Sequence, residues 1–168
     1  MCHSIEFALP VIFVVAAAAG GAAAKDGPPE PLPEPIVAAW KNAGAEVGWM
    51  RFLYILQFVP AGQGEPGDLP AFRFSPWRHG LLAKLADPGR AFALDLSGTD
   101  LTDAGLKELT GLKSLKMLGI GMTYVTDAGL KELARLKNLR KLSLGAGVTD
   151  AGLKELRKAL PACRINGR

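Results

Sequence analysis

Three aspartates in repeated positions are the most conspicuous candidates for chemistry in this chain. Asp103, Asp127 and Asp150 each follow a threonine in three copies of the sequence TDAGLKEL. Carboxylates stacked in series could hold a cation, but each also lies in the first turn of a predicted helix, where the helix dipole favours a negative charge. We therefore interpret the aspartates as structural and predict no metal site.

A histidine and a cysteine are the remaining candidates for catalysis. His79 lies beside Trp77, and the rest of the chain supplies no serine–histidine–aspartate order and no phosphate-cradling GxxxxGK motif. Cys163 takes a position that leucines hold in the earlier copies, so we expect it to act as a small buried hydrophobe. The sequence thus predicts no catalytic residue and no cofactor. A small enzyme with a site near Trp77 and His79 is the least favoured alternative.

The elements that position these residues belong to a repeat. Thr102, Thr126 and Thr149 open the three copies, in steps of 24 and 23 residues. Each copy joins an apolar–variable–apolar strand triplet to leucines spaced along one helical face. One unit cannot bury both surfaces alone, so we expect the units to stack, with parallel strands on a concave face and helices on a convex face. The triplets start at Leu94, Leu118, Leu142 and Cys163.

In the turn between strand and helix, almost every residue has a predicted structural role. Thr126 is the predicted N-cap of its helix, and Val125 and Leu130 are spaced as a hydrophobic staple. Gly129 falls at the third helical position, where we expect the neighbouring unit to leave no room for a side chain. The equivalent residues of the other copies are Leu101, Thr102, Gly105 and Leu106, and Val148, Thr149, Gly152 and Leu153.

These repeats resemble those of a bacterial leucine-rich-repeat family common in planctomycete-type genomes. Units of that family read close to L-x-L-x-x-T-x-V-T-D-A-G-L-K-E-L-x-x-L-x-x-L, and the match covers residues 92–165. The units are also similar to the repeats of F-box-associated leucine-rich proteins. Thr99 and Thr123 stand where many leucine-rich repeats carry asparagine, and the third copy is one residue shorter. The resemblance implies an α/β leucine-rich-repeat solenoid, a short horseshoe ended by a terminator at "LRKALPACRI".

The N-terminal part of the chain divides into three predicted segments. Residues 1–24 are typical of a signal peptide or an N-terminal membrane anchor, because their apolar core is about as long as a signal-peptide core. Residues 25–35 form a predicted Pro/Glu-rich linker. Residues 36–90 form a predicted α/β capping region, and residues 91–168 hold the repeats and the terminator. We therefore expect export to the periplasm or outside the cell, or anchoring by an uncleaved N-terminal segment.

The capping region contains five predicted elements and all three tryptophans. Two helices that carry Trp40 and Trp77 are expected to pack over the first repeat unit. Trp49 lies in a predicted strand and is expected to pack within the capping region. The helices are predicted at 36–43 and 77–86, and the strands at 46–52, 54–59 and 71–74.

The net charge of +4 comes from the repeats, since residues 91–168 carry thirteen basic and eight acidic residues. Lys107, Lys131 and Lys154 each precede a glutamate on the predicted solvated helix face, and no aromatic residues interleave the basic positions. We therefore expect no specific nucleic-acid partner, and at most weak contact with anionic envelope polymers.

By resemblance, the strand face is the expected binding face for a protein or envelope partner. This implies a non-enzymatic binding or scaffold protein. The alternative is an adaptor that recruits substrates for protein degradation, as in F-box leucine-rich proteins. The candidate contact residues are Asp95, Met117, Lys141, Ser143 and Arg164.

Overall fold

The structure is a computed structural model that describes residues 30–53 and 55–167. The predicted signal peptide or anchor lies outside the described residues. Seven strands form one sheet in the order β2-β1-β3-β4-β5-β6-β7. The strands are β1 (Glu46–Phe52), β2 (Leu56–Pro60), β3 (Leu69–Arg73), β4 (Phe92–Asp95), β5 (Leu115–Ile120), β6 (Lys141–Leu144) and β7 (Arg164–Gly167).

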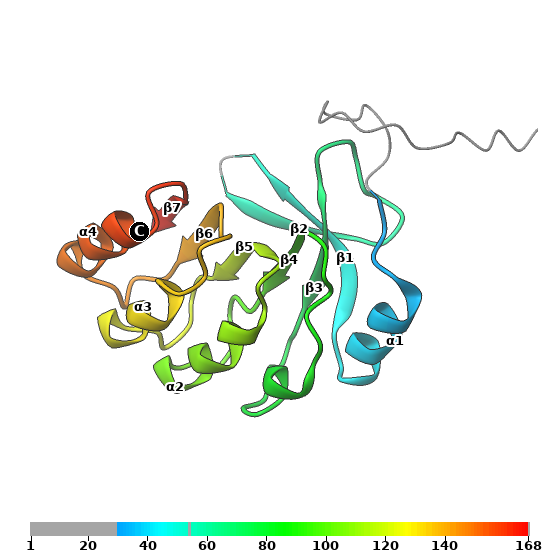
Figure 1. The fold of residues 1–168 in the computed structure, drawn as a ribbon, viewed down its shortest axis with the longest axis horizontal. Helices are drawn as coiled ribbons and strands as arrows, with labels where there is room; N and C mark the ends of the chain where they lie inside the picture. The colour runs from blue at the N-terminus through cyan, green and yellow to red at the C-terminus, as the bar shows by residue number, and fades with distance from the viewer. Residues whose placement is uncertain (1–29, 54, 168) are drawn as a thin grey trace, which may run out of the picture.

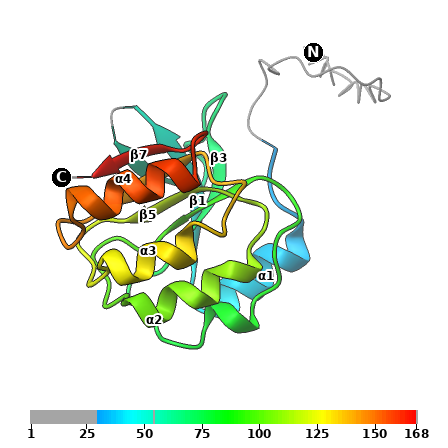
Figure 2. The same cartoon turned by 60° about the vertical axis from the view of Figure 1, so that its left-hand side comes forward.

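The sheet is curled into a half-barrel with helices along its outer side (Figure 1). Strand β1 pairs antiparallel with β2 and with β3, and the remaining neighbours from β3 to β7 pair in parallel. Figure 2 shows α2, α3 and α4 side by side over the parallel strands. The predicted α/β class is confirmed. The helices are α1 (Glu34–Asn42), α2 (Asp103–Leu106), α3 (Asp127–Leu133) and α4 (Asp150–Ala159), with 3-10 turns η1 (Leu82–Lys84) and η2 (Lys107–Gly111).

One hydrophobic core fills the space between sheet and helices. It runs from Leu32, before α1, to Leu160, after α4, so the N-terminal region and the repeat units share it. Trp40 is fully buried in this core, stacks on Phe72 with ring centroids 4.2 Å apart, and donates its indole N–H to the Ala86 carbonyl at 3.2 Å. The predicted place of Trp40 at the first repeat unit is confirmed by its edge contact with Phe92 of β4.

The predicted helix at 77–86 is wrong, because only the turn η1 forms there. Glu108 from the first repeat unit accepts the backbone N–H groups of Gly80 at 2.7 Å and Leu82 at 3.0 Å. These two groups are therefore bonded to a residue far along the chain. Trp77 still packs against the first unit, since a Cβ added to Gly105 would lie 2.5 Å from its ring.

Hydrogen bonds between the repeated turns connect each unit to the next. The Asp103 carboxylate accepts the backbone N–H of Thr126 at 2.8 Å and its hydroxyl at 2.7 Å. Asp127 accepts the same two groups from Thr149, which together lower the pKa of Asp127. The aspartates thus bond to the following unit, in addition to lying in the first turn of a helix.

The repeated glycines lie where these aspartates pack. A Cβ on Gly129 would collide with Asp103 Oδ1, and one on Gly152 would collide with Asp127 Oδ1. The expectation that the neighbouring unit leaves no room for a side chain is confirmed. Capping by threonine is confirmed for Thr126 and Thr149, whose hydroxyls accept backbone N–H groups, but Thr102 makes no such bond.

The register of the last strand corrects one sequence assignment. Leu142 pairs with Ile165 and Lys141 pairs with Arg164. Cys163 therefore does not take the position of Leu142, and it lies partly buried at the edge of the core. A step of 23 residues, as between Thr126 and Thr149, leads from Leu142 to Ile165, so the repeat period itself contains the correct register.

We expect Trp40→Ala to lower the free energy of unfolding by about 3–5 kcal/mol, because it empties the largest fully buried side-chain site of the core. Urea denaturation measures the change. Leu53→Ala is the matched control, and since this side chain is 61% exposed its effect is expected within about 0.5 kcal/mol. Equal losses in the two variants would contradict the assigned role of Trp40.

We expect Gly129→Ala to cost about 1–3 kcal/mol of unfolding free energy, through its clash with Asp103 and Leu106. In an Asp103→Ala background the same change is expected to cost less, because one of the clashing groups is gone. A double-mutant cycle by urea denaturation measures this coupling. Gly111→Ala, whose Cβ would meet no atom within 4 Å, is the control. Purely additive losses would refute the contact.

Candidate functional site

The concave side of the sheet carries all five sequence-predicted contact residues. Strand register places two rows of side chains across it, one residue per strand in each row. The first row is Ala71, Ala93, Met117, Lys141 and Arg164. The second row is Arg73, Asp95, Gly119, Ser143 and Asn166. Because alternate residues of a strand face opposite sides, the leucines between these positions point into the core.

Two of the five predicted residues are engaged in holding the fold. Met117 is only 7% exposed and packs in a second apolar cluster with Met50, Phe58, Ala71 and Ala93. Asp95 accepts a hydrogen bond from Arg73 Nε at 3.0 Å and one from the Ser97 backbone N–H at 3.1 Å. That Met117 and Asp95 contact a partner stays a prediction, and in this structure Met117 is covered and Asp95 is bonded to Arg73.

The hairpin of β1 and β2 is the reason for this burial. Figure 1 shows it curling over the concave side, toward β6 and β7. Phe58 of β2 packs in the second cluster, and the Arg73 guanidinium lies 4.0 Å from the centre of its ring. The sequence of β1 contained a signal for this burial. Trp49 and Met50 are both apolar although they face opposite sides of the sheet, as in strands that are covered on both faces.

At the far end of the hairpin, Phe52 contacts two of the three remaining predicted residues, Lys141 and Arg164. Lys141 Nζ lies 4.1 Å from the centre of the Phe52 ring, and Arg164 Cζ lies 5.9 Å from it. Such contacts attract a cation to the aromatic ring. Ser143 lies one pleat further along β6 from Lys141. We name Phe52, Lys141, Ser143 and Arg164 the basic corner.

The basic corner holds two like charges side by side. Lys141 and Arg164 are direct register partners on neighbouring strands, an arrangement that disfavours both charges. Partial burial, and then the charge of Arg164, lower the pKa of Lys141. Within residues 30–53 and 55–167, no carboxylate forms an ion pair with either side chain.

Arginines on the N-terminal strands of the same sheet, unlike Lys141 and Arg164, have carboxylate partners. Arg73 of β3 pairs with Asp95 at 3.0 Å, and Arg51 of β1 pairs with Asp68 at 2.9 Å and Glu65 at 3.1 Å. Burial raises the pKa of Asp68, but the bonds from Arg51 and from the Glu65 backbone N–H outweigh it and lower the pKa overall. Among the described residues of the concave face, Lys141 and Arg164, on β6 and β7, are therefore the charged side chains without an oppositely charged partner.

The surroundings of the basic corner combine apolar and polar groups. Leu53 and Ile55 lie one and three positions after Phe52 in the sequence and are 61% and 67% exposed. Beside Ser143, a Cβ on Gly121 would have only the Ser97 and Ser143 hydroxyls near it, at 3.8 and 4.0 Å. The corner therefore offers cations, hydroxyls and apolar side chains to a partner.

The residues considered for catalysis do not come together. His79 is exposed, and its Nδ1 lies 3.5 Å from a Glu108 oxygen that already accepts the Gly80 N–H. Burial raises the pKa of Cys163 to about 11, although Arg140 acts to lower it. Since the thiolate is the reactive form, the raised pKa disfavours reaction of this thiol at neutral pH.

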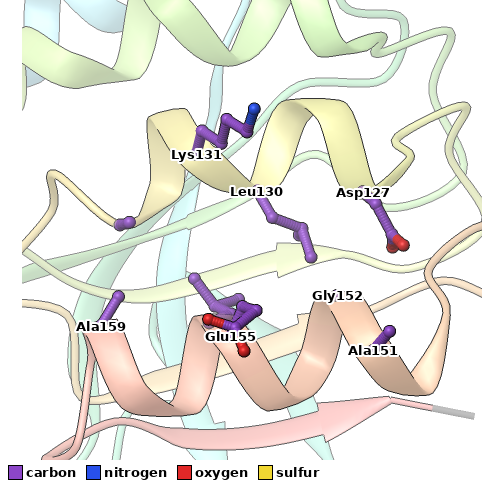
Figure 3. A pocket seen from close by; sticks show the side chains of 9 residues that line it. Asp127, Leu130, Lys131, Ala151, Gly152, Glu155 and Ala159 are labelled. Carbon is purple, nitrogen blue, oxygen red and sulfur yellow. The ribbon is translucent and has the colours of Figure 1, made fainter.

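A groove of about 500 Å³ lies between α3 and α4 on the helical side (Figure 3). Leu130 and Leu156 contribute to its apolar lining, and Gly152 and Ala159 leave space between the helices. Asp127 at one end is already bonded to Thr149. Because a specific ligand site needs a few converging polar groups, we favour the basic corner over this groove.

We expect Arg164→Gln to raise the pKa of Lys141 toward the usual lysine value of about 10.4, because loss of the neighbouring positive charge makes protonation of the amine easier. An NMR titration of the labelled lysine measures the shift. Lys107→Gln, on the helical side, is the control and is expected to leave this pKa unchanged. A pKa that stays the same or falls in Arg164→Gln would contradict the geometry of the corner.

No protein-family model matches the chain, and no curated protein matches its sequence. Among the described residues, no helix has the length and apolarity needed to cross a membrane. The same residues contain no cluster of three or more histidine, cysteine or acidic side chains that could hold a metal ion. The geometry of the concave face is therefore the basis on which a function can be assigned.

Proposed function

We propose that this protein is a non-enzymatic binding protein of the leucine-rich-repeat type, which recognises a protein partner through the basic corner of its concave face. The repeat type is supported by the 24-residue steps from Leu94 to Leu118 to Leu142, which are register partners on neighbouring parallel strands. We further propose that the chain acts outside the cytoplasm, on the strength of the signal-like residues 1–24.

One observation carries the binding proposal. Lys141 and Arg164 are held side by side, against Phe52, without an acidic partner in the described chain. Placing like charges side by side opposes folding, so the pairing of Lys141 with Arg164 does not itself stabilise the fold, although the contact with Phe52 is attractive. Arginine and aromatic side chains are also those that most often contribute strongly to protein–protein binding. The combination is therefore better explained by an external ligand.

A steric block of the concave face tests this function without changing its charge. We expect Ser143→Trp to weaken partner binding at least about tenfold, because the indole occupies the floor next to Lys141. Partners are first captured with the wild-type protein from extracts of the source cells. Each captured protein is then purified and titrated against wild type and variant by calorimetry.

Ala104→Trp adds the same side chain at an exposed position on the helical side, also without changing the charge, and is the matched control. Thermal melts of both variants verify that they fold. A partner that binds Ser143→Trp as tightly as wild type, or that loses affinity equally for both variants, would show that the concave face is not the binding surface.

A further inference from the structure

We propose that the basic corner takes an acidic peptide segment in extended conformation, whose carboxylates lie on Lys141 and Arg164 and whose apolar side chains lie on the end of the β1–β2 hairpin. This inference rests on the proposed function and specifies the chemistry of the partner.

Charge complementarity is the first argument. On the same concave face, Arg73 has the Asp95 carboxylate as a partner at 3.0 Å, whereas Lys141 and Arg164 have no carboxylate partner in residues 30–53 and 55–167. The ring of Phe52 lies 4.1 Å from the Lys141 ammonium and so limits its freedom before any ligand arrives. A carboxylate between the two cations would relieve their repulsion and form charge-assisted hydrogen bonds.

The spacing of the cations fits an extended chain. Lys141 and Arg164 stand on neighbouring strands, which lie about 4.8 Å apart. Every second side chain of an extended peptide faces the same way, about 6–7 Å from the next. The long side chains of lysine and arginine accommodate this small difference. An extended segment can therefore place one carboxylate near each cation.

The floor beside the cations leaves room for the backbone of such a segment. Gly121 stands where a larger residue would fill the concave face, and within 4 Å of its missing side chain lie only the Ser97 and Ser143 hydroxyls. These hydroxyls can donate hydrogen bonds to carbonyl or carboxylate oxygens. The residues next to the basic corner are therefore small and polar.

The apolar rim distinguishes a peptide from an anionic polysaccharide. Leu53 and Ile55 are large and exposed, and they lie within three residues of Phe52 in the sequence. Exposed apolar groups that border a charged patch are typical of surfaces that bind proteins. A polyuronate would supply carboxylates but no apolar side chain to cover Leu53 and Ile55. We therefore assign an acidic peptide with interspersed apolar residues as the occupant.

Fluorescence anisotropy with the full chain tests the inference. The probe is a short fluorescein-labelled peptide that alternates glutamate with leucine and glycine, and its comparison is the same peptide with glutamine in place of glutamate. We expect the acidic probe to bind at least about tenfold more tightly than the glutamine probe, with an affinity that falls as salt rises. Equal binding of the two probes, or no binding of either at low salt, would overturn the inference.

Two variants locate the site of the probe. Combined Lys141→Gln and Arg164→Gln changes are expected to weaken binding at least about tenfold. Combined Lys107→Gln and Lys154→Gln changes remove the same charge from the helical side and are expected to have less than about a twofold effect. Similar losses in the two variants would show nonspecific attraction to a basic protein and would overturn the inference.

The apolar rim has its own test. Combined Leu53→Ser and Ile55→Ser changes keep the net charge and are expected to weaken the peptide probe about threefold or more. Polygalacturonate is added as a competitor of the bound peptide. If polygalacturonate displaces the labelled peptide at a carboxylate concentration equal to or lower than unlabelled peptide requires, the site is of a polysaccharide type and the inference is contradicted. Full affinity of the serine variant for the peptide probe would contradict the apolar rim and with it the assigned peptide.

The outcome separates this inference from the proposed function. If the natural partner loses affinity for Ser143→Trp but the acidic probe fails, the binding face stands and only the assigned chemistry is wrong. If the natural partner binds Ser143→Trp as tightly as wild type while the probe binds the basic corner, the assignment of the concave face as the binding surface for that partner is wrong instead.

Discussion

The contact of each repeated glycine with an aspartate of the preceding unit is the constraint on which the fold depends. Gly129 and Gly152 let Asp103 and Asp127 approach the first turn of the next helix, where the carboxylates accept two hydrogen bonds from one threonine. These bonds join the helical layers while the parallel strands join the inner layer. Because both layers are linked at every step, the units have one stacking geometry, and the curl of the sheet follows from it.

The first repeat unit has no preceding unit to pack against, and the N-terminal region covers it instead. Trp40 fills the space beside Phe92, and Trp77 lies on Gly105, at the place that an aspartate takes in later units. Glu108 in turn holds the backbone of the segment after Trp77. The first repeat and the N-terminal region are therefore part of one core, from Leu32 onward.

Covering the first unit also decides what remains of the concave face. The β1–β2 hairpin packs on Met117 and brings Phe52 over Lys141, so the half of the face near β3 and β4 is closed. Arg73 in the closed half has Asp95 as its carboxylate partner, as partial burial of a charge requires. Lys141 and Arg164, at the open end, keep their charge without one among the described residues. We infer that the hairpin narrows a broad strand face to one basic corner.

The sequence by itself determined the features that depend on neighbouring residues. The repeat period, the alternation within each strand triplet, the capping threonines and the tight glycines are local patterns, and the α/β class follows from them. The register of β7 was also present in the period, although the triplet ending at Ile165 suggested another alignment. Only the tertiary structure decided the features that depend on distant residues. No helix spans 77–86, because Gly80 adopts a positive φ of 83° and Glu108 accepts the N–H groups of Gly80 and Leu82. Met117 is buried because a hairpin some sixty residues earlier covers it. The basic corner likewise exists only where the curl of the sheet brings Phe52 to Lys141 and Arg164, a meeting that no local pattern records.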